Sequence, residues 1–198
     1  MTAAVRKTTD ALFSDVAPFA IRTERASDVA AREILLDACF GEDRHTRTCQ
    51  RLRDGRAPAE GLAFSAVHRG KLVGTVRLWH VSAGGVPALV LGPLAVDASC
   101  RSLGVGAALM EHALAAAKAR GHNAVLLRGD PAYYERFGFS AEKTGDLALP
   151  GPFERERLLA VELHEGALDD AWGMIVATGA KARRSRTAKT RVIAAVAA

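Results

Sequence analysis

The chain has 198 residues, of which 49% are hydrophobic and 25% charged, with a formal net charge of +5. This length and composition are typical of one soluble globular domain. No apolar run is long enough to span a bilayer, and Asp10 and Asp15 interrupt the stretch where a signal peptide needs apolar residues, so we expect a cytoplasmic protein with no membrane partner. The three cysteines fit no metal spacing, which predicts reduced thiols and no metal site.

The first half of the chain predicts a strand, two helices and a hairpin. Phe19–Arg25 alternates as a strand does, and a capped helix follows up to Phe40. A second short helix is predicted over His45–Asp54, ended by a glycine. Leu62–His68 and Lys71–Val81 are two strand-like runs joined by a glycine turn, which is typical of a hairpin.

The second half predicts further strands around one long helix. Ala88–Val96 is a strongly apolar strand, and residues 104–120 carry a single apolar stripe at helical spacing. Ala124–Arg128 is a strand, Pro131 opens a short helix, and Leu158–Leu163 is a late strand. This order of elements predicts an α+β fold with a largely antiparallel sheet before the long helix.

The positive charge gathers at the C-terminal end of the chain. Residues 181–198 contain no acid, and their six cations are Lys181, Arg183, Arg184, Arg186, Lys189 and Arg191, so the rest of the chain is close to neutral. Residues 181–191 could contact nucleic acid, but the absence of interleaved aromatic residues favours a solvated extension. We predict a domain over residues 19–179, between a loose leader (1–18) and a basic tail (180–198).

Two glycines mark an expected anion site where the long helix begins. Gly104 and Gly106 allow main-chain N–H groups to approach a ligand closely, and the first turn of a helix has unpaired N–H donors at its positive end. A P-loop would need Gly-Lys-Ser/Thr, which does not occur, and a dinucleotide fingerprint would need a third glycine where Leu109 stands. Both common nucleotide-binding motifs are therefore excluded.

Three blocks of sequence resemble the general N-acetyltransferase (GNAT) superfamily. The turn Arg101–Gly106 (RSLGVG) matches the family's [RQ]-x-x-G-x-[GA], the preceding Leu94–Val96 (LAV) resembles its L-x-V strand, and Tyr134–Phe139 (YERFGF) resembles its Y-E-x-x-G-F ending. The run GDPAYYERFGF and the late strand RLLAVEL are similar to the YhbS-like group of predicted bacterial acetyltransferases. The resemblance covers roughly residues 19–179.

This resemblance implies the GNAT fold, a mixed but mostly antiparallel sheet of six to seven strands flanked by helices and splayed at the cofactor strand. It implies acetyl-CoA as co-substrate, with pantetheine along the strand and pyrophosphate on the amides of the turn. The implied cofactor-binding residues are Leu94, Ala95, Val96, Arg101, Ser102, Leu103, Gly104, Val105, Gly106 and Ala107.

The resemblance also implies direct attack by an amine on the thioester, with Tyr134 as the general acid that protonates the departing thiolate. A tyrosine whose pKa is near ~10 is protonated at neutral pH, so it can serve as a donor. The neighbouring Tyr133 is assigned to packing. Several GNAT enzymes carry a glutamate on the strand equivalent to Ala88–Val96, and none stands here, so the general base is unassigned; His80 and Glu60 are weak candidates.

Alternatives of other classes remain open at this point. A catalytically idle acyl-CoA-binding or regulatory module would have the same fold, and the retained Tyr134 counts against it. A nucleic-acid-associated protein would act through the tail. The sequence leaves the acceptor open between a small amine and a peptide amine, and it leaves a homodimer open, because substrate loops vary freely on one scaffold.

Overall fold

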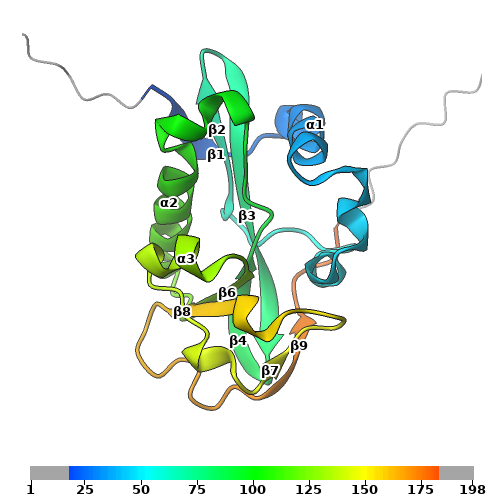
Figure 1. Cartoon of the computed structure of the whole chain (residues 1–198), viewed down its shortest axis with the longest axis vertical. Helices are drawn as coiled ribbons and strands as arrows, with labels where there is room; N and C mark the ends of the chain where they lie inside the picture. Colours follow the sequence, from blue (N-terminus) through cyan, green and yellow to red (C-terminus); the bar gives the residue numbers. More distant parts are fainter. Residues whose placement is uncertain (1–17, 183–198) are drawn as a thin grey trace, which may run out of the picture.

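A computed structural model describes residues 18–182, which form a sheet in the order β1-β2-β3-β4-β6-β8, with β5 and β9 also paired to β3 and β7 to β9 (Figure 1). The strands are β1 (Ala20–Thr23), β2 (Ala63–His68), β3 (Lys71–Ala83), β4 (Val86–Leu91), β5 (Ala95–Val96), β6 (Ala124–Arg128), β7 (Leu147–Ala148), β8 (Leu158–Glu162) and β9 (Gly173–Ala177). The α+β class is confirmed. The sheet has nine strands rather than six to seven, because β5 and β7 are two-residue pairings and β9 has no strong sequence signal.

The long strand β3 is the centre of the sheet. It pairs antiparallel with β2, β4, β5 and β9, and the predicted hairpin is the β2–β3 pair. Only β4–β6 and β7–β9 are parallel among the strand pairs of residues 18–182. The sheet is therefore mixed and mostly antiparallel, as predicted.

Two helices cover opposite sides of β3, α1 (Val29–Phe40) and α2 (Val105–Ala119), and the short α3 (Pro131–Tyr134) lies near β6 (Figure 1). The predicted apolar stripe of α2 is buried in the core through Val105, Leu109, Met110, Ala113 and Ala117. Gly74 on β3 allows this close contact, since a Cβ there would lie 2.8 Å from Val105 Cγ1. Helix and strand thus pack tightly where the expected anion site begins.

The helix predicted over His45–Asp54 is wrong. The segment forms two 3-10 turns, η2 (Glu42–Thr46) and η3 (Thr48–Leu52), separated by the extended residue Arg47. Leu52 is the only buried residue of the two turns, so no apolar stripe holds a regular helix against the sheet.

The single strand predicted over Ala88–Val96 is also wrong, because it breaks between β4 and β5. The main-chain N–H of Gly92 donates to the Arg77 carbonyl oxygen over 2.8 Å, and the Gly92 carbonyl accepts from Trp79 Nε1 over 2.6 Å. Pro93 follows and has no N–H for a sheet ladder. These contacts keep Gly92 against β3, and after the interruption at Pro93 and Leu94 the chain pairs with β3 again as β5.

The last described residues of the chain pair with an earlier turn. Residues 180–182 pair with residues 55–57, through Ala57 N–H to the Ala180 carbonyl (2.8 Å) and Ala182 N–H to the Gly55 carbonyl (2.9 Å). Residues 1–17 and 183–198, which contain most of the predicted leader and basic tail, lie outside the described residues. The division into leader, domain and tail, and any nucleic-acid contact of residues 181–191, therefore remain predictions.

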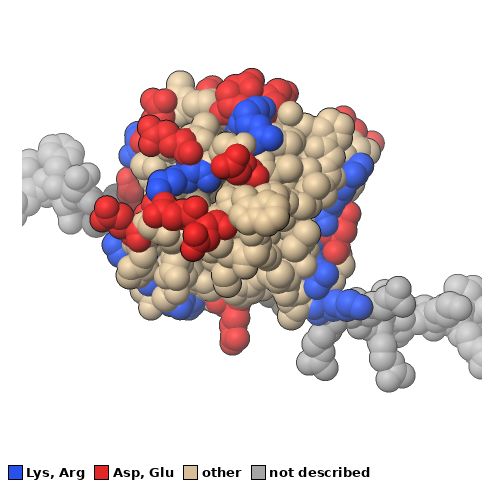
Figure 2. Space-filling model, turned by 90° about the horizontal axis from the view of Figure 1, so that it is seen from below, with Lys and Arg blue, Asp and Glu red and all other residues tan. Residues whose placement is uncertain are grey.

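The end of the molecule with β7 and β9 has an uncharged area bordered largely by acidic side chains (Figure 2). Trp172 is 75% exposed here, and Met174 and Val176 on β9 are also exposed. No helix in residues 18–182 combines the length and the apolar character that crossing a membrane requires. The homodimer stays a prediction.

Candidate active site

A cavity of about 440 Å³ lies between β5, the start of α2 and α3. Of the ten predicted cofactor residues, seven line it: Leu94, Ala95, Val96, Arg101, Gly104, Gly106 and Ala107. Tyr134 lines the same cavity. The structure thus brings together the three sequence blocks, which are separated along the chain by up to forty residues.

The strand side of this cavity comes from the break between β4 and β5. The β4 strand pairs with β6 only at Leu89 and Val90, and β5 pairs only with β3 among the described strands. The edge of β5 that faces away from β3 therefore has no strand partner. This is the splay that the resemblance implies, and it leaves main-chain groups able to pair with an extended ligand.

The turn side of the cavity is built by a 3-10 segment that leads into α2. Asp97 begins η4 (Ala98–Leu103): its carboxylate accepts from the Ser99 N–H over 2.9 Å and from the Ser99 hydroxyl over 2.6 Å, which lowers the pKa of Asp97. Gly104 follows with φ +74°, a conformation that favours glycine, and no heavy atom would lie within 4 Å of a Cβ there. The first amides of α2 are therefore accessible to an anion.

Three of the predicted residues, Ser102, Leu103 and Val105, do not line the cavity. The Val105 side chain is fully buried in the core against Gly74, and Leu103 packs at the edge of the same core. Their side chains hold the turn in place. Any contact of Val105 with a phosphate would come from its main-chain N–H.

Tyr134 is placed by a capped turn and by a glycine. Asp130 accepts from the Ala132 N–H at the start of α3, and the Tyr134 ring lies against Gly129, where a Cβ would be 2.1 Å from Tyr134 Cε2. Burial, with a further contribution from Tyr133, raises the pKa of Tyr134 to about 12. Its hydroxyl is therefore protonated at neutral pH and can donate a proton.

We expect Gly129→Ala to displace the Tyr134 ring and lower the free energy of unfolding by about 1–3 kcal/mol, the usual cost of overpacking. Urea unfolding followed by fluorescence measures this. Gly145→Ala is the control, because Gly145 has φ −52° and a Cβ there would meet nothing within 4 Å. Equal stability of the two variants would show that Tyr134 does not depend on Gly129.

Four lining residues were not among the predicted cofactor and catalytic residues: Cys39, Phe40, Tyr133 and Arg136. Tyr133 packs edge to face on Tyr134 at 4.9 Å, as predicted, and its hydroxyl also reaches α2, 3.0 Å from where a Cβ of Gly106 would lie. The Arg136 guanidinium stacks over the Tyr133 ring at 4.1 Å. Tyr133 adjoins the Tyr134–Phe139 motif and Arg136 lies inside it, whereas Cys39 and Phe40 come from the distant end of α1, where no local pattern marks them.

The two weak candidates for a general base do not reach this cavity. His80 lines a separate cavity on the far part of β3, with its ring 5.3 Å from His122, and Glu60 lines neither. No Asp, Glu or His among residues 18–182 lines the cavity that contains Tyr134. Within residues 18–182, no three His, Cys, Asp or Glu side chains gather as a metal site would require.

The fold and this site define an acetyltransferase. Residues 29–139 match the model of the acetyltransferase (GNAT) family, which spans α1, the hairpin, the turn, α2 and Tyr134. The chain belongs to this family, and the predicted family and enzyme class are confirmed.

The relatives include a protein of the predicted group. The N-acetyltransferase YhbS of Escherichia coli K12, described as uncharacterized, is 29% identical over 157 residues, which cover 78% of this chain and 93% of YhbS. A crystal structure of E. coli YhbS in complex with CoA has a TM-score of 0.71 at 28% identity, covering 82% of this chain and 91% of the other. A Brucella melitensis GNAT acetyltransferase in complex with acetyl-CoA has a TM-score of 0.55 at 25% identity, covering 77% and 99%.

Proposed function

We propose that this protein binds acetyl-CoA in the cavity between β5 and α2 and transfers the acetyl group to a primary amine. The observation that carries the proposal is the cavity itself, because it joins an unpaired strand edge, the open start of a 15-residue helix and a protonated tyrosine. The relatives bound to CoA and to acetyl-CoA support the same ligand.

Each part of the cavity would hold one part of the ligand. The free edge of β5, with Leu94 just before it, is suited to main-chain hydrogen bonds with the pantetheine arm. The amides around Gly104 and Gly106, with the positive end of α2, are suited to the pyrophosphate, and Arg101 adds a cation beside them. Glycine at these positions keeps side chains out of the path of the phosphates.

The proposed reaction is direct attack. The amine nitrogen forms a bond to the thioester carbonyl carbon, the carbon–sulfur bond breaks, and Tyr134 gives its proton to the departing thiolate. Solvent then returns a proton to Tyr134. Because no Asp, Glu or His lines the cavity, we propose that the amine reacts from its neutral fraction and releases its proton to water.

We expect acetyl-CoA to stabilise the protein against heat, and ATP and NAD to have no effect. A ligand that binds only the folded state adds roughly 2.7 kcal/mol at a hundredfold excess over its dissociation constant. Thermal unfolding with each ligand at matched concentration and salt measures this.

The same experiment separates the proposal from its rivals. A shift with ATP and none with acetyl-CoA or CoA would contradict the proposal. A shift with acetyl-CoA but no acetylation across a panel of amines and peptides would favour the idle acyl-CoA-binding module, which has the same cavity without the reaction.

A further inference from the structure

A second, smaller cavity of about 120 Å³ adjoins the first, and it lies where the chain passes from β4 to β5. Leu91, Gly92 and Pro93 form one wall, and the turns η2 and η3 form the other. Phe40 lines both cavities, and Pro93 is followed directly by Leu94 of the larger one. A group held here would therefore lie next to the reacting end of pantetheine placed along β5.

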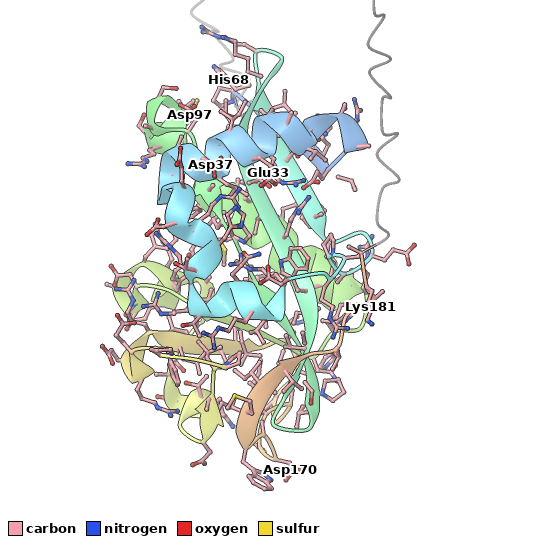
Figure 3. All side chains as sticks on the ribbon, turned by 90° about the vertical axis from the view of Figure 1, so that its right-hand side faces the viewer. Glu33, Asp37, His68, Asp97, Asp170 and Lys181 are labelled. Carbon is pink, nitrogen blue, oxygen red and sulfur yellow. The ribbon has the colours of Figure 1, made fainter. Side chains whose placement is uncertain are left out.

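The lining of this smaller cavity is strongly cationic. In the described part of the chain, no Asp or Glu lines it and four arginines do, namely Arg44, Arg47, Arg53 and Arg128. Carboxylates outside the lining offset two of these charges. Arg44 pairs with Glu33 (2.5 Å) and Asp37 (2.7 Å), both on α1 above the 3-10 turns (Figure 3), and Arg128 pairs with Glu154.

Arg53 is partly buried and has no ion-pair partner among the described residues. Its Nε donates to the Cys49 carbonyl oxygen over 3.2 Å, and it forms no ion pair with any carboxylate of residues 18–182. Its Nη1 lies 3.7 Å from the place where a Cβ of Gly92 would stand, so the guanidinium is at the strand break. Burial lowers the pKa of Arg53, the charges of Cys49 and Asp54 partly oppose this, and Arg44 and Arg47 lower it again, but an arginine remains a cation at neutral pH.

We propose that Arg53 binds an anionic group of the acceptor, so that the substrate is a small amine carrying a carboxylate or a phosphate. This rests on the proposed acetyl transfer. A desolvated cation without a counter-charge is unfavourable, and an anion in this cavity would remove that cost. The planar fork of arginine matches both carboxylate and phosphate, and a cavity this small accepts such a group rather than a large side chain.

This arrangement would orient the acceptor. With its anionic end on Arg53 beside Gly92, the rest of the molecule extends towards Phe40 and Pro93, which border the larger cavity. The amine would then face the thioester at the end of β5. Arg47 is exposed at the mouth of the cavity, where its Nη2 donates to the Phe40 carbonyl oxygen, and it adds attraction for anions.

The test compares each acceptor with a neutral partner of nearly the same shape. Amino acids are paired with their amides, and aminoalkyl phosphates with the corresponding amino alcohols, at saturating acetyl-CoA and fixed ionic strength. The variants are Arg53→Gln, which removes the charge, and Arg53→Lys, which keeps it without the fork. Lys118→Gln is the control, because Lys118 is an exposed cation on α2 outside both cavities.

We expect the wild-type protein to prefer at least one anionic acceptor over its neutral partner by roughly 10- to 100-fold in kcat/KM, the range for a hydrogen bond to a charged group. Arg53→Gln should abolish the preference, Arg53→Lys should retain part of it, and Lys118→Gln should leave it unchanged. Acetyl-CoA binding, measured by calorimetry, should be the same in all four proteins. The pair that shows the preference identifies the anion as carboxylate or phosphate.

Three results would overturn the inference. The first is no preference for any anionic acceptor, in turnover or in direct binding to the CoA-saturated protein. The second is a preference that survives in Arg53→Gln. The third is loss of acetyl-CoA affinity in Arg53→Gln, which would place Arg53 in the cofactor site. Failure of the wild-type protein to bind acetyl-CoA would instead refute the proposed function.

Discussion

Replacing Tyr134 by phenylalanine is expected to reduce kcat by roughly 10²–10⁴, the usual contribution of a general acid. The variant keeps the ring that packs against Gly129 and Phe139 and loses only the hydroxyl. Because the proposed role of that hydroxyl is to donate a proton in the reaction, and not to hold the phosphates, the affinity for acetyl-CoA should be nearly unchanged. Steady-state kinetics and calorimetry on the same preparation measure both quantities.

Tyr133→Phe is the matched control, since its ring lies 4.9 Å from that of Tyr134 and lines the same cavity. Its hydroxyl reaches the start of α2, so its loss should alter acetyl-CoA affinity slightly and leave kcat within a few-fold. If kcat falls strongly in Tyr133→Phe and not in Tyr134→Phe, the roles of the two residues must be exchanged. If neither loses activity, the thiolate leaves without a proton from either ring.

Replacing Gly104 by aspartate should weaken acetyl-CoA binding by about 100-fold or more. Two like unit charges about 4 Å apart repel each other by about 4 kcal/mol at an effective dielectric constant near 20. The new carboxylate would lie beside the proposed position of the pyrophosphate. The site has room for the side chain, because a Cβ on Gly104 would meet nothing within 4 Å. The fold should therefore survive, apart from the strain of φ +74°.

Gly104→Asn separates charge from strain. Asparagine has the same shape as aspartate, tolerates the left-handed conformation and carries no charge. We expect it to bind acetyl-CoA much more tightly than Gly104→Asp does, with similar thermal stability of the two unliganded proteins. Equal affinities of the two variants would mean that the phosphates bind elsewhere.

The cofactor cavity could be predicted from the sequence because most of it is local. Leu94–Ala107 is one continuous segment, and the strand, turn and helix that it forms have strong patterns of their own. Pro93 indicates a bulge or an edge in this strand, but the sequence does not predict that the strand ends at Leu91, since this depends on contacts of Gly92 with Arg77 and Trp79 on another strand. A run of apolar residues does not reveal where its hydrogen bonds go.

The smaller cavity could not be predicted, because its walls come from segments far apart in the chain. Arg53 resembles any cation of a solvated turn until the fold places it beside Gly92. The same applies to Phe40, whose position at the end of α1 is fixed only by the packing of that helix. A periodic pattern within one helix or strand can be recognised in a single sequence. Contacts between elements that lie far apart in the chain cannot.

The pairing of residues 180–182 with residues 55–57 has a consequence for how this enzyme can diversify. The family match ends at residue 139, so residues 180–182, which pair with the turn after Arg53, lie beyond the matched region. Substitutions in residues 180–182 would shift residues 55–57, and with them the nearby Arg53, while leaving the β5–α2 segment untouched. If Arg53 binds the acceptor as proposed, the segments that choose the acceptor are separate from the segment that holds the acyl donor, and the two can change independently.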